Sequence, residues 1–256
     1  MRSLKTATLA LGVAFGLIGG SALAAGEAPT PPSQNWSFEG IFGTYDRSAA
    51  QRGFQVYQEV CSSCHSMDLL DYRHLEQIGL SEEEVTAVAS DYTVTDGPDG
   101  SGNMFERPAE ATDSFVAPFA NEAAARAANN GAYPPDLSLI TKARGGGADY
   151  IYALLTGYED PPDDVEPAPG QYYNRYFPGH LLAMPDMLSD GGVEYARSGP
   201  ASVDQQAHDV SVFLAWASEP HMEDRKRMGA KVLLFLVVFT GMLYAVKRKV
   251  WSDVDH

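Results

Sequence analysis

The sequence predicts a mainly α-helical protein with long loops and insertions and one C-terminal transmembrane helix. Several short segments carry helix-start signals followed by apolar side chains at helical spacing, whereas an alternating strand pattern of any length and an internal repeat are both lacking. The long connections between these segments are rich in Gly and Pro, of which the chain has 24 and 16. Residues 228–246 form an apolar run long enough to cross a bilayer.

The N-terminal end has the pattern of a secretory signal. Arg2 and Lys5 precede a short apolar run at residues 9–18, and small residues at 22 and 24 offer a cleavage site. We therefore predict that residues 1–24 are a signal peptide and that residues 25–224 form one extracytoplasmic domain.

The first part of that domain predicts an arm followed by a helix. Residues 26–46 are rich in Pro and polar side chains, and we expect Trp36, Phe38 and Phe42 to lay this arm over the domain. A helix is predicted over residues 52–64, with Phe54, Tyr57 and Cys61 on one side.

Capping residues predict further helices. Ser81 and Glu84 form a capping box that predicts a short helix, whereas residues 91–118 are predicted as loop. The alanine-rich segment 121–130 is capped by Asn121 and closed by Gly131, and residues 149–156 form a helix ended by Gly157.

After a loop-rich stretch at residues 157–200, Ser202 and Gln205 form a second capping box. The helix that it opens places one apolar stripe toward the core. The stripe comprises Val203, Ala207, Val210, Leu214 and Ala217.

The C-terminal segment predicts a membrane anchor. Residues 228–246 carry one charge, Lys231, and as a helix they would extend roughly 28 Å, close to the hydrocarbon thickness of a bilayer. Basic residues flank both ends, so charge alone does not orient the helix. The signal peptide does, which makes residues 225–249 the anchor and residues 250–256 a short cytoplasmic tail.

The charge of the chain is acidic and uneven. Residues 25–224 hold 9 Lys/Arg and 32 Asp/Glu, a net charge of −23, whereas the whole chain has −16. Such a domain repels nucleic acid and attracts basic proteins; solubility alone is the alternative reading. Five carboxylates fall within eight residues: Glu159, Asp160, Asp163, Asp164 and Glu166.

The two cysteines of the chain carry the most specific motif. Cys61-Ser62-Ser63-Cys64-His65 fits the pattern for c-type haem attachment, in which two thioethers hold the porphyrin and the following His binds the iron. A redox-active CxxC would need a strand–helix unit of the thioredoxin kind, which the pattern does not predict. A zinc site would need a second Cys/His pair at ligand spacing, but the remaining histidines are scattered.

The motif does not determine the sixth iron ligand. Besides an open position, the candidates are Met67, Met104, Met184, Met187, Met222 and His180. Met67 is too close to His65 to reach the opposite face, Met104 lies among Gly and Asp, and Met222 borders the anchor. Met184 is favoured because its neighbours are apolar and Pro185 disposes it to an extended backbone. His180 and then Met187 follow. Imidazole and thioether ligation would raise the potential and favour electron transfer over catalysis.

At this point the chain resembles the cytochrome c1 family, the haem c subunits of quinol–cytochrome c reductase (the cytochrome bc1 complex), of the bacterial type. Beyond the cysteine motif, the resemblance rests on the run Ala-Asn-Asn-Gly-Ala-x-Pro-Pro-Asp-Leu-Ser at residues 128–138, on residues 150–158 and 176–179, and on Ala183-Met184-Pro185. It implies a class I-like c-type cytochrome core with one covalent haem c. It also implies Met184 as axial ligand and Arg126 near a haem propionate.

The resemblance further implies a place in a respiratory chain. The haem would accept one electron from the Rieske iron–sulfur protein and pass it to a soluble basic cytochrome c, beside cytochrome b in a dimeric complex. The chain would not be an enzyme on its own. It would lie in the bacterial inner membrane as a single-pass protein, in contact with lipid, with the haem domain in the periplasm. The alternatives are a stand-alone membrane-anchored cytochrome c that feeds an oxidase, and a haem peroxidase with an exchangeable ligand.

Overall fold

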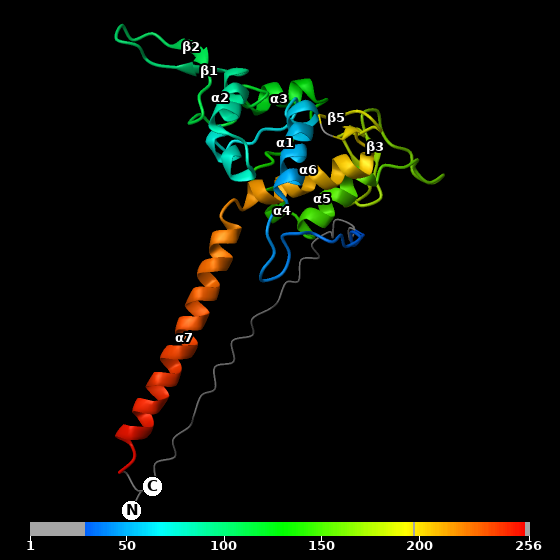
Figure 1. Ribbon diagram of the computed structural model, residues 1–256. Helices are drawn as coiled ribbons and strands as arrows, with labels where there is room; N and C mark the ends of the chain where they lie inside the picture. Colours follow the sequence, from blue (N-terminus) through cyan, green and yellow to red (C-terminus); the bar gives the residue numbers. More distant parts are fainter. Residues whose placement is uncertain (1–28, 197, 254–256) are drawn as a thin grey trace, which may run out of the picture.

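A computed structural model describes residues 29–196 and 198–253 of the chain. The predicted signal peptide and the last three residues of the predicted tail lie outside the described residues. The prediction of a mainly helical protein is confirmed: a helical domain sits above one long C-terminal helix, α7 (Figure 1).

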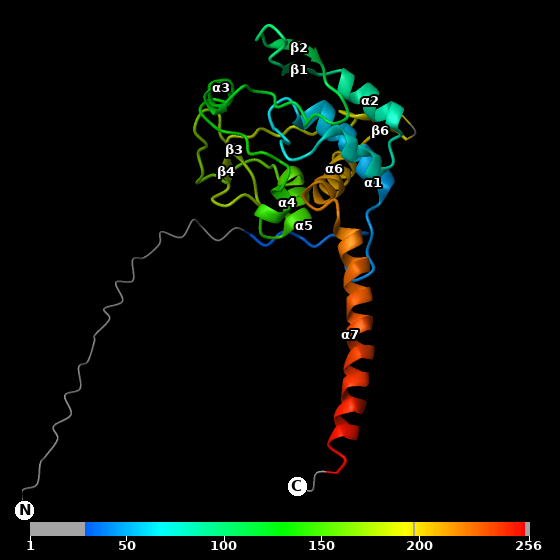
Figure 2. The same cartoon turned by 90° about the vertical axis from the view of Figure 1, so that its left-hand side faces the viewer.

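Two helices cross at the centre of the domain, α1 (Arg47–Val56) and α6 (Val203–Ser218) (Figure 2). Their backbones approach most closely at Gly53, where a Cβ atom would lie 2.0 Å from the carbonyl oxygen of Asp209. Only glycine allows this contact. Beside it, Arg52 Nε binds the buried Asp209 carboxylate at 2.7 Å.

The predicted helix over residues 52–64 has different bounds. It begins at Arg47 because the Asp46 carboxylate accepts a hydrogen bond from the Ala49 N–H at 3.1 Å. It then widens into a π-helix, η1 (Tyr57–Cys61), instead of continuing as an α-helix to residue 64. Such π-turns are frequent at functional sites, and this one delivers Cys61 to the cavity described below.

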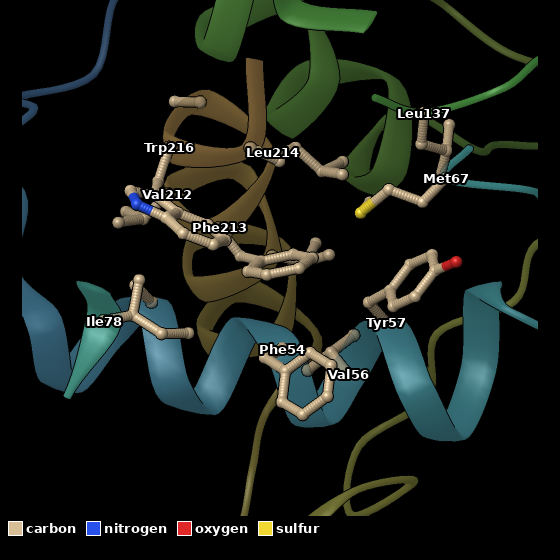
Figure 3. Packing of buried hydrophobic residues seen from close by; sticks show 14 of the residues in the cluster. Phe54, Val56, Tyr57, Met67, Ile78, Leu137, Val212, Phe213, Leu214 and Trp216 are labelled. Carbon is tan, nitrogen blue, oxygen red and sulfur yellow. The ribbon is translucent and has the colours of Figure 1, made fainter. Parts of the chain in front are cut away.

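Aromatic rings fill the space between α1 and α6. The ring centroid of Phe213 lies 5.6 Å from Phe54 and 5.7 Å from Tyr57, and Met67 and Leu137 close the cluster at its side (Figure 3). Phe115 adds a third ring, 6.1 Å from both Phe54 and Tyr57.

Helix α6 is buried more completely than its predicted stripe. Four of the five stripe residues are buried, whereas Val203 is only partly buried. Polar side chains on the other faces, Gln206, Asp209 and Ser211 among them, are buried as well. The helix runs through the core, so apolar spacing identifies only one of its contact faces.

A 3₁₀ helix, η2 (Tyr72–Ile78), leads to α2 (Glu82–Ser90). The capping box is confirmed: Ser81 Oγ accepts from the Glu84 N–H at 3.2 Å, and the Ser81 N–H donates to Glu84 Oε2 at 2.7 Å. The prediction of loop over residues 91–118 is wrong in part, because strands β1 (Thr93–Asp96) and β2 (Phe105–Pro108) form an antiparallel hairpin. The strands are only four residues long and their one partly buried apolar side chain is Val94, so they carry no hydrophobic alternation.

The predicted short helices are present. Helix α3 (Glu122–Ala128) is capped by Asn121, and α5 (Gly147–Thr156) starts two residues before the predicted bound. A one-turn helix that was not predicted, α4 (Ile140–Ala143), lies between them. Ser202 caps α6 through the Gln205 N–H at 3.2 Å. Two-residue strands also pair in the loop-rich region. They are β3 (Tyr172–Tyr173) with β4 (Leu181–Leu182), and β5 (Glu194–Tyr195) with β6 (Gly199–Pro200).

The N-terminal arm lies over the domain as predicted, except at its tip. Trp36 is buried, donates from Nε1 to Asp149 at 2.7 Å and stacks on His208 at 5.1 Å. Phe38 packs against the same core. Phe42 does not: it is 89% exposed, because the chain turns at Gly40 and directs Phe42 away from the domain.

The C-terminal helix α7 (Met222–Val250) covers the predicted membrane span. Within the described residues it is the one helix long and apolar enough to cross a membrane, and none of its apolar part is buried. Its first turn is joined to the domain by Glu223, whose carboxylate accepts from the Arg47 guanidinium at 2.8 Å and from the Tyr45 N–H at 3.0 Å. These features of the described residues fit a single-pass membrane protein.

Candidate functional site

A deep apolar cavity of about 440 Å³ opens between the cysteine motif and the loop after β4. Its walls come from η1, from residues 129–137, from α5 and α6, and from the segment that follows β4. Aliphatic and aromatic side chains dominate the lining, as in pockets for large flat cofactors, and they keep water away from a bound group.

Cys61 and Cys64 line one wall of this cavity, and both are free thiols in the polypeptide. Burial raises the pKa of the Cys61 thiol to about 12. A redox-active CxxC requires the opposite, a thiol whose pKa is lowered so that the thiolate forms. The environment therefore fits cysteines that are joined to a cofactor better than cysteines that exchange disulfides.

His65 lies on the same wall, and its ring is fixed by one hydrogen bond. The Nδ1–H donates to the carbonyl oxygen of Pro135 at 2.8 Å. Burial lowers the pKa of His65, which keeps the imidazole neutral. Since Nδ1 holds the proton, Nε2 is the atom left with a lone pair for a metal.

The segment that supplies this carbonyl is clamped to the cysteine motif by Asp136. Its Oδ2 accepts from Ser66 Oγ and from the Asp68 N–H, both at 2.8 Å, and its Oδ1 accepts from the Ser138 N–H. Burial alone would raise the pKa of Asp136, but these hydrogen bonds outweigh it and hold the pKa below its ordinary value. The run Pro-Pro-Asp-Leu-Ser thus positions the histidine ring, a role that the sequence pattern did not predict.

Met184 lines the cavity, on the loop that follows β4. The Tyr158 hydroxyl donates to the Met184 carbonyl oxygen at 2.9 Å and holds the backbone in place. The structure therefore places Met184 on the same cavity as Cys61, Cys64 and His65. Its role as iron ligand stays a prediction.

The other candidates for the sixth ligand lie in different surroundings. Met67 is buried in the core, Met104 is 59% exposed, and Met222 lies buried at the start of α7. His180 is outside the cavity lining: its ring stacks on Tyr173 at 5.5 Å, and its Nδ1 lies 3.3 Å from the Asn174 carbonyl oxygen. Met187 does line the cavity and remains the alternative.

Two arginines bear on the propionate prediction. Arg126 is set back from the cavity: it binds Glu122 at 2.7 Å, donates to the Gly131 carbonyl oxygen at 2.9 Å and lies over the ring of Tyr133, which itself lines the cavity. Arg144, at the end of α4, lines the cavity directly. Arg144 was not among the predicted site residues, although its place before three consecutive glycines marks a turn that could have singled it out.

The residues present fit haem c. Two cysteines at the attachment spacing, a neutral imidazole with one free nitrogen and a thioether face one apolar cavity, and an arginine at its edge suits an ionised carboxylate.

Comparison with known proteins agrees with this fit. The model of the Cytochrome C1 family matches residues 36–254. Cytochrome c1 of Rhodospirillum rubrum is 46% identical, over 98% of both chains. The protein named "Cytochrome c1-1, heme protein, mitochondrial" of Solanum tuberosum is 52% identical, over 86% of this chain and 69% of its own. The protein named "Cytochrome b/c1" of Bradyrhizobium diazoefficiens is 49% identical over 87% of this chain, which spans only 36% of that relative. The chain therefore belongs to the cytochrome c1 family, and its cofactor is covalently bound haem c.

Proposed function

We propose that this chain is the electron-transfer subunit of a membrane-bound quinol–cytochrome c reductase. Cys61 and Cys64 carry the haem as thioethers, and His65 and Met184 are its axial ligands. One observation carries the proposal: these four side chains line a single apolar cavity in which Pro135 already fixes the tautomer of His65.

The haem supplies a one-electron couple, and the chain adjusts and protects it. The hydrogen bond from His65 to Pro135 orients the imidazole, and the apolar walls exclude water. A neutral thioether from Met184 favours the ferrous state and closes the sixth position to small ligands. For that reason the chain relays electrons and catalyses no bond-making reaction of its own.

The propionates need cationic partners because the cavity is otherwise apolar. Arg126 keeps its proposed role near one propionate, acting at the rim beside Tyr133. Arg144 is the more direct partner because it belongs to the cavity wall.

The electron donor and acceptor follow from the family. We assign a Rieske iron–sulfur protein as donor and a soluble basic cytochrome c as acceptor. Cytochrome b is the membrane partner, a role supported by the name of the Bradyrhizobium relative, which joins b and c1. The complex is proposed to be dimeric.

Charge supports a basic acceptor. The five carboxylates from Glu159 to Glu166 are all exposed. Their loop starts directly after Tyr158, whose hydroxyl holds the Met184 carbonyl, and it projects from the domain (Figure 1). A positively charged protein steered to this loop arrives beside the Met184 side of the cavity, and its arrival rate falls as salt rises.

The proposed topology follows from the predicted signal peptide. Residues 1–24 are removed on export, residues 25–224 form the haem domain in the periplasm, and residues 225–249 cross the bacterial inner membrane. Residues 250–256 stay in the cytoplasm.

Purification of the tagged full chain from its native membrane tests the proposal. Acid-acetone should leave the haem on the polypeptide, and a b-type cytochrome and an iron–sulfur protein should copurify. A chain that releases its haem contradicts covalent attachment. A chain that copurifies with an oxidase and without the b-type cytochrome is instead a stand-alone carrier.

A further inference from the structure

The loop formed by residues 38–43 presents two neighbouring apolar side chains to the outside. Ile41 is 74% exposed and Phe42 is 89% exposed. A single exposed apolar residue is ordinary on a protein surface. Two adjacent ones at the tip of a turn call for a reason in the surroundings of that turn.

The base of this loop is rigid. The Thr44 N–H donates to the Ser37 carbonyl at 3.0 Å, and the Glu39 N–H donates to the Trp36 carbonyl at 3.2 Å. At Gly43 a Cβ atom would lie 1.9 Å from the carbonyl oxygen of Glu39, so the loop closes tightly on itself. The tip therefore keeps its direction relative to the domain.

The loop is also bound to the start of α7. Lys226 Nζ donates to the carbonyl oxygens of Phe38 at 2.7 Å and of Gly43 at 3.0 Å. Both views show the loop descending from the domain beside the first turns of α7 (Figures 1 and 2). One ammonium group thus fixes the height of the loop along the helix.

The level of Lys226 along α7 corresponds to the edge of the bilayer. The uninterrupted apolar part of α7 begins at Val232, directly after Lys231 and six residues after Lys226, which corresponds to about 9 Å along a helix, within the headgroup layer. Arg225 and Arg227 mark the same level with charge, as expected where a membrane helix enters the headgroup layer. The base of the loop is held at this level along α7. The Ile41 and Phe42 side chains extend from the base into the interfacial layer of the membrane.

We propose that the loop of residues 38–43 is a second membrane contact, in which Ile41 and Phe42 enter the interfacial layer of the leaflet on the domain side. Lipid fits better than a protein partner. A protein interface of ordinary size takes roughly 20–30 residues from each side, whereas an interfacial lipid layer accepts single apolar side chains without a matching surface.

The second contact restrains motions of the domain that α7 alone permits. One helix permits tilt and rotation of the domain about its axis. The tip of the loop, held to α7 by Lys226 and to the domain by Trp36, gives the domain a second point on the bilayer. The haem cavity is thereby held in one orientation above the membrane.

A nitroxide label tests this inference in the full-length holoprotein, within its complex and in bilayer nanodiscs. Cys61 and Cys64 are consumed by haem, so Phe42→Cys introduces the one reactive thiol of this chain, which is labelled before the complex is assembled with it. Power saturation then compares collisions with oxygen, which concentrates in lipid, and with a polar nickel chelate, which stays in water. The power saturation with each reagent is compared with the power saturation under nitrogen. The constant relaxation enhancement from the haem therefore cancels.

Two labelled positions serve as references. Phe105→Cys on β2 reports water, because the hairpin lies at the end of the domain away from α7 (Figure 1). Val237→Cys reports lipid, because it is 71% exposed in the middle of α7. The inference rests on α7 crossing the bilayer, and Val237→Cys tests that premise separately.

We expect a higher oxygen-to-nickel ratio at Phe42→Cys than at Phe105→Cys, approaching the ratio at Val237→Cys. A ratio at position 42 equal to that of Phe105→Cys overturns the inference if Val237→Cys reports lipid. Low collision rates with both reagents at position 42 overturn it as well, because they place the side chain against a protein. A water-like ratio at Val237→Cys instead contradicts the membrane span itself.

Discussion

The Nδ1 atom of His65 lies 2.8 Å from the carbonyl oxygen of Pro135, which is 70 residues further along the chain. This one bond joins the two sequence motifs that identify the family. It explains the second motif physically: Asp136 ties the segment to Ser66 and Asp68, so the carbonyl is held where the imidazole needs an acceptor.

Replacing the thioether tests the sixth ligand. We expect Met184→Leu to lose the charge-transfer band of ferric iron–methionine, to lower the reduction potential strongly and to let the reduced protein bind carbon monoxide, because the sixth position opens. Absorption spectra and a redox titration of the purified complex measure these changes. Met187→Leu, on the same cavity wall, is the matched control and should keep all three properties. The reverse result would give the role to Met187.

Removing the clamp tests the positioning of His65. We expect Asp136→Ala to destabilise the domain by about 2 kcal/mol, because three donors lose their acceptor. Thermal unfolding of the holoprotein measures the loss. The potential should also shift, because the Pro135 carbonyl no longer fixes the ring. Ser66→Ala removes one of these bonds and should show a smaller change of the same sign. A potential unchanged in Asp136→Ala would show that the clamp is merely structural.

The ion pair between Arg52 and Asp209 predicts how stability depends on pH. Burial alone would raise the pKa of Asp209, but hydrogen bonds from His208 and Arg52 outweigh it and leave the pKa below its ordinary value. A carboxyl whose folded pKa is depressed stabilises the fold fully above its unfolded pKa of about 4, and this contribution disappears as the pH falls through the folded pKa.

Thermal unfolding between neutral pH and pH values below about 4 measures this effect. We expect Asp209→Asn to be less stable at neutral pH and to lose less stability on acidification than the unmodified protein. Asp163→Asn, at an exposed carboxyl, should leave both quantities unchanged. Parallel pH curves for Asp209→Asn and the unmodified protein would contradict the role of this pair.

The contact between α1 and α6 predicts that Gly53 is irreplaceable. We expect Gly53→Ala to cost roughly 3 kcal/mol, the upper end for overpacking, because the added methyl would lie 2.0 Å from the Asp209 carbonyl. The amount of holoprotein in membranes and its unfolding temperature measure this. Gly229→Ala is the matched helical control, since its Cβ would meet nothing within 4 Å. Equal stability of the two variants would show that the helices can separate at no cost.

The difference between Gly53 and Ser81 shows what sequence alone can predict. Ser81 caps α2 through bonds within four residues, so a local pattern was sufficient, and the same holds for Asn121 and α3. Gly53 matters because of Asp209, which is 156 positions away, and no local pattern contains that distance. The hairpin β1–β2 was missed because its four-residue strands half-bury a single apolar side chain, Val94, which is too little for a recognisable alternation.

The same distinction applies to the site. Cys61, Cys64 and His65 follow from one local motif, and Met184 from the resemblance and from an apolar context before a proline. Arg144 is brought to the cavity only by the packing of α4, which sequence spacing does not contain. Phe42 was predicted to lie over the domain as part of the N-terminal arm, but the chain turns at Gly40 and Phe42 is exposed.

The acidic loop predicts a rate that depends on salt. We expect the double change Asp163→Asn and Asp164→Asn to slow reduction of a basic soluble cytochrome c at low ionic strength, because fewer carboxylates attract it. The two rates should converge as ionic strength rises and the Debye length falls to about 8 Å at physiological salt. Stopped-flow mixing of the reduced complex with the acceptor measures both. Glu82→Gln with Glu83→Gln removes the same charge from α2 and should have a smaller effect, because α2 contributes no residue to the cavity wall. Equal slowing by both pairs would assign the effect to net charge and not to this loop.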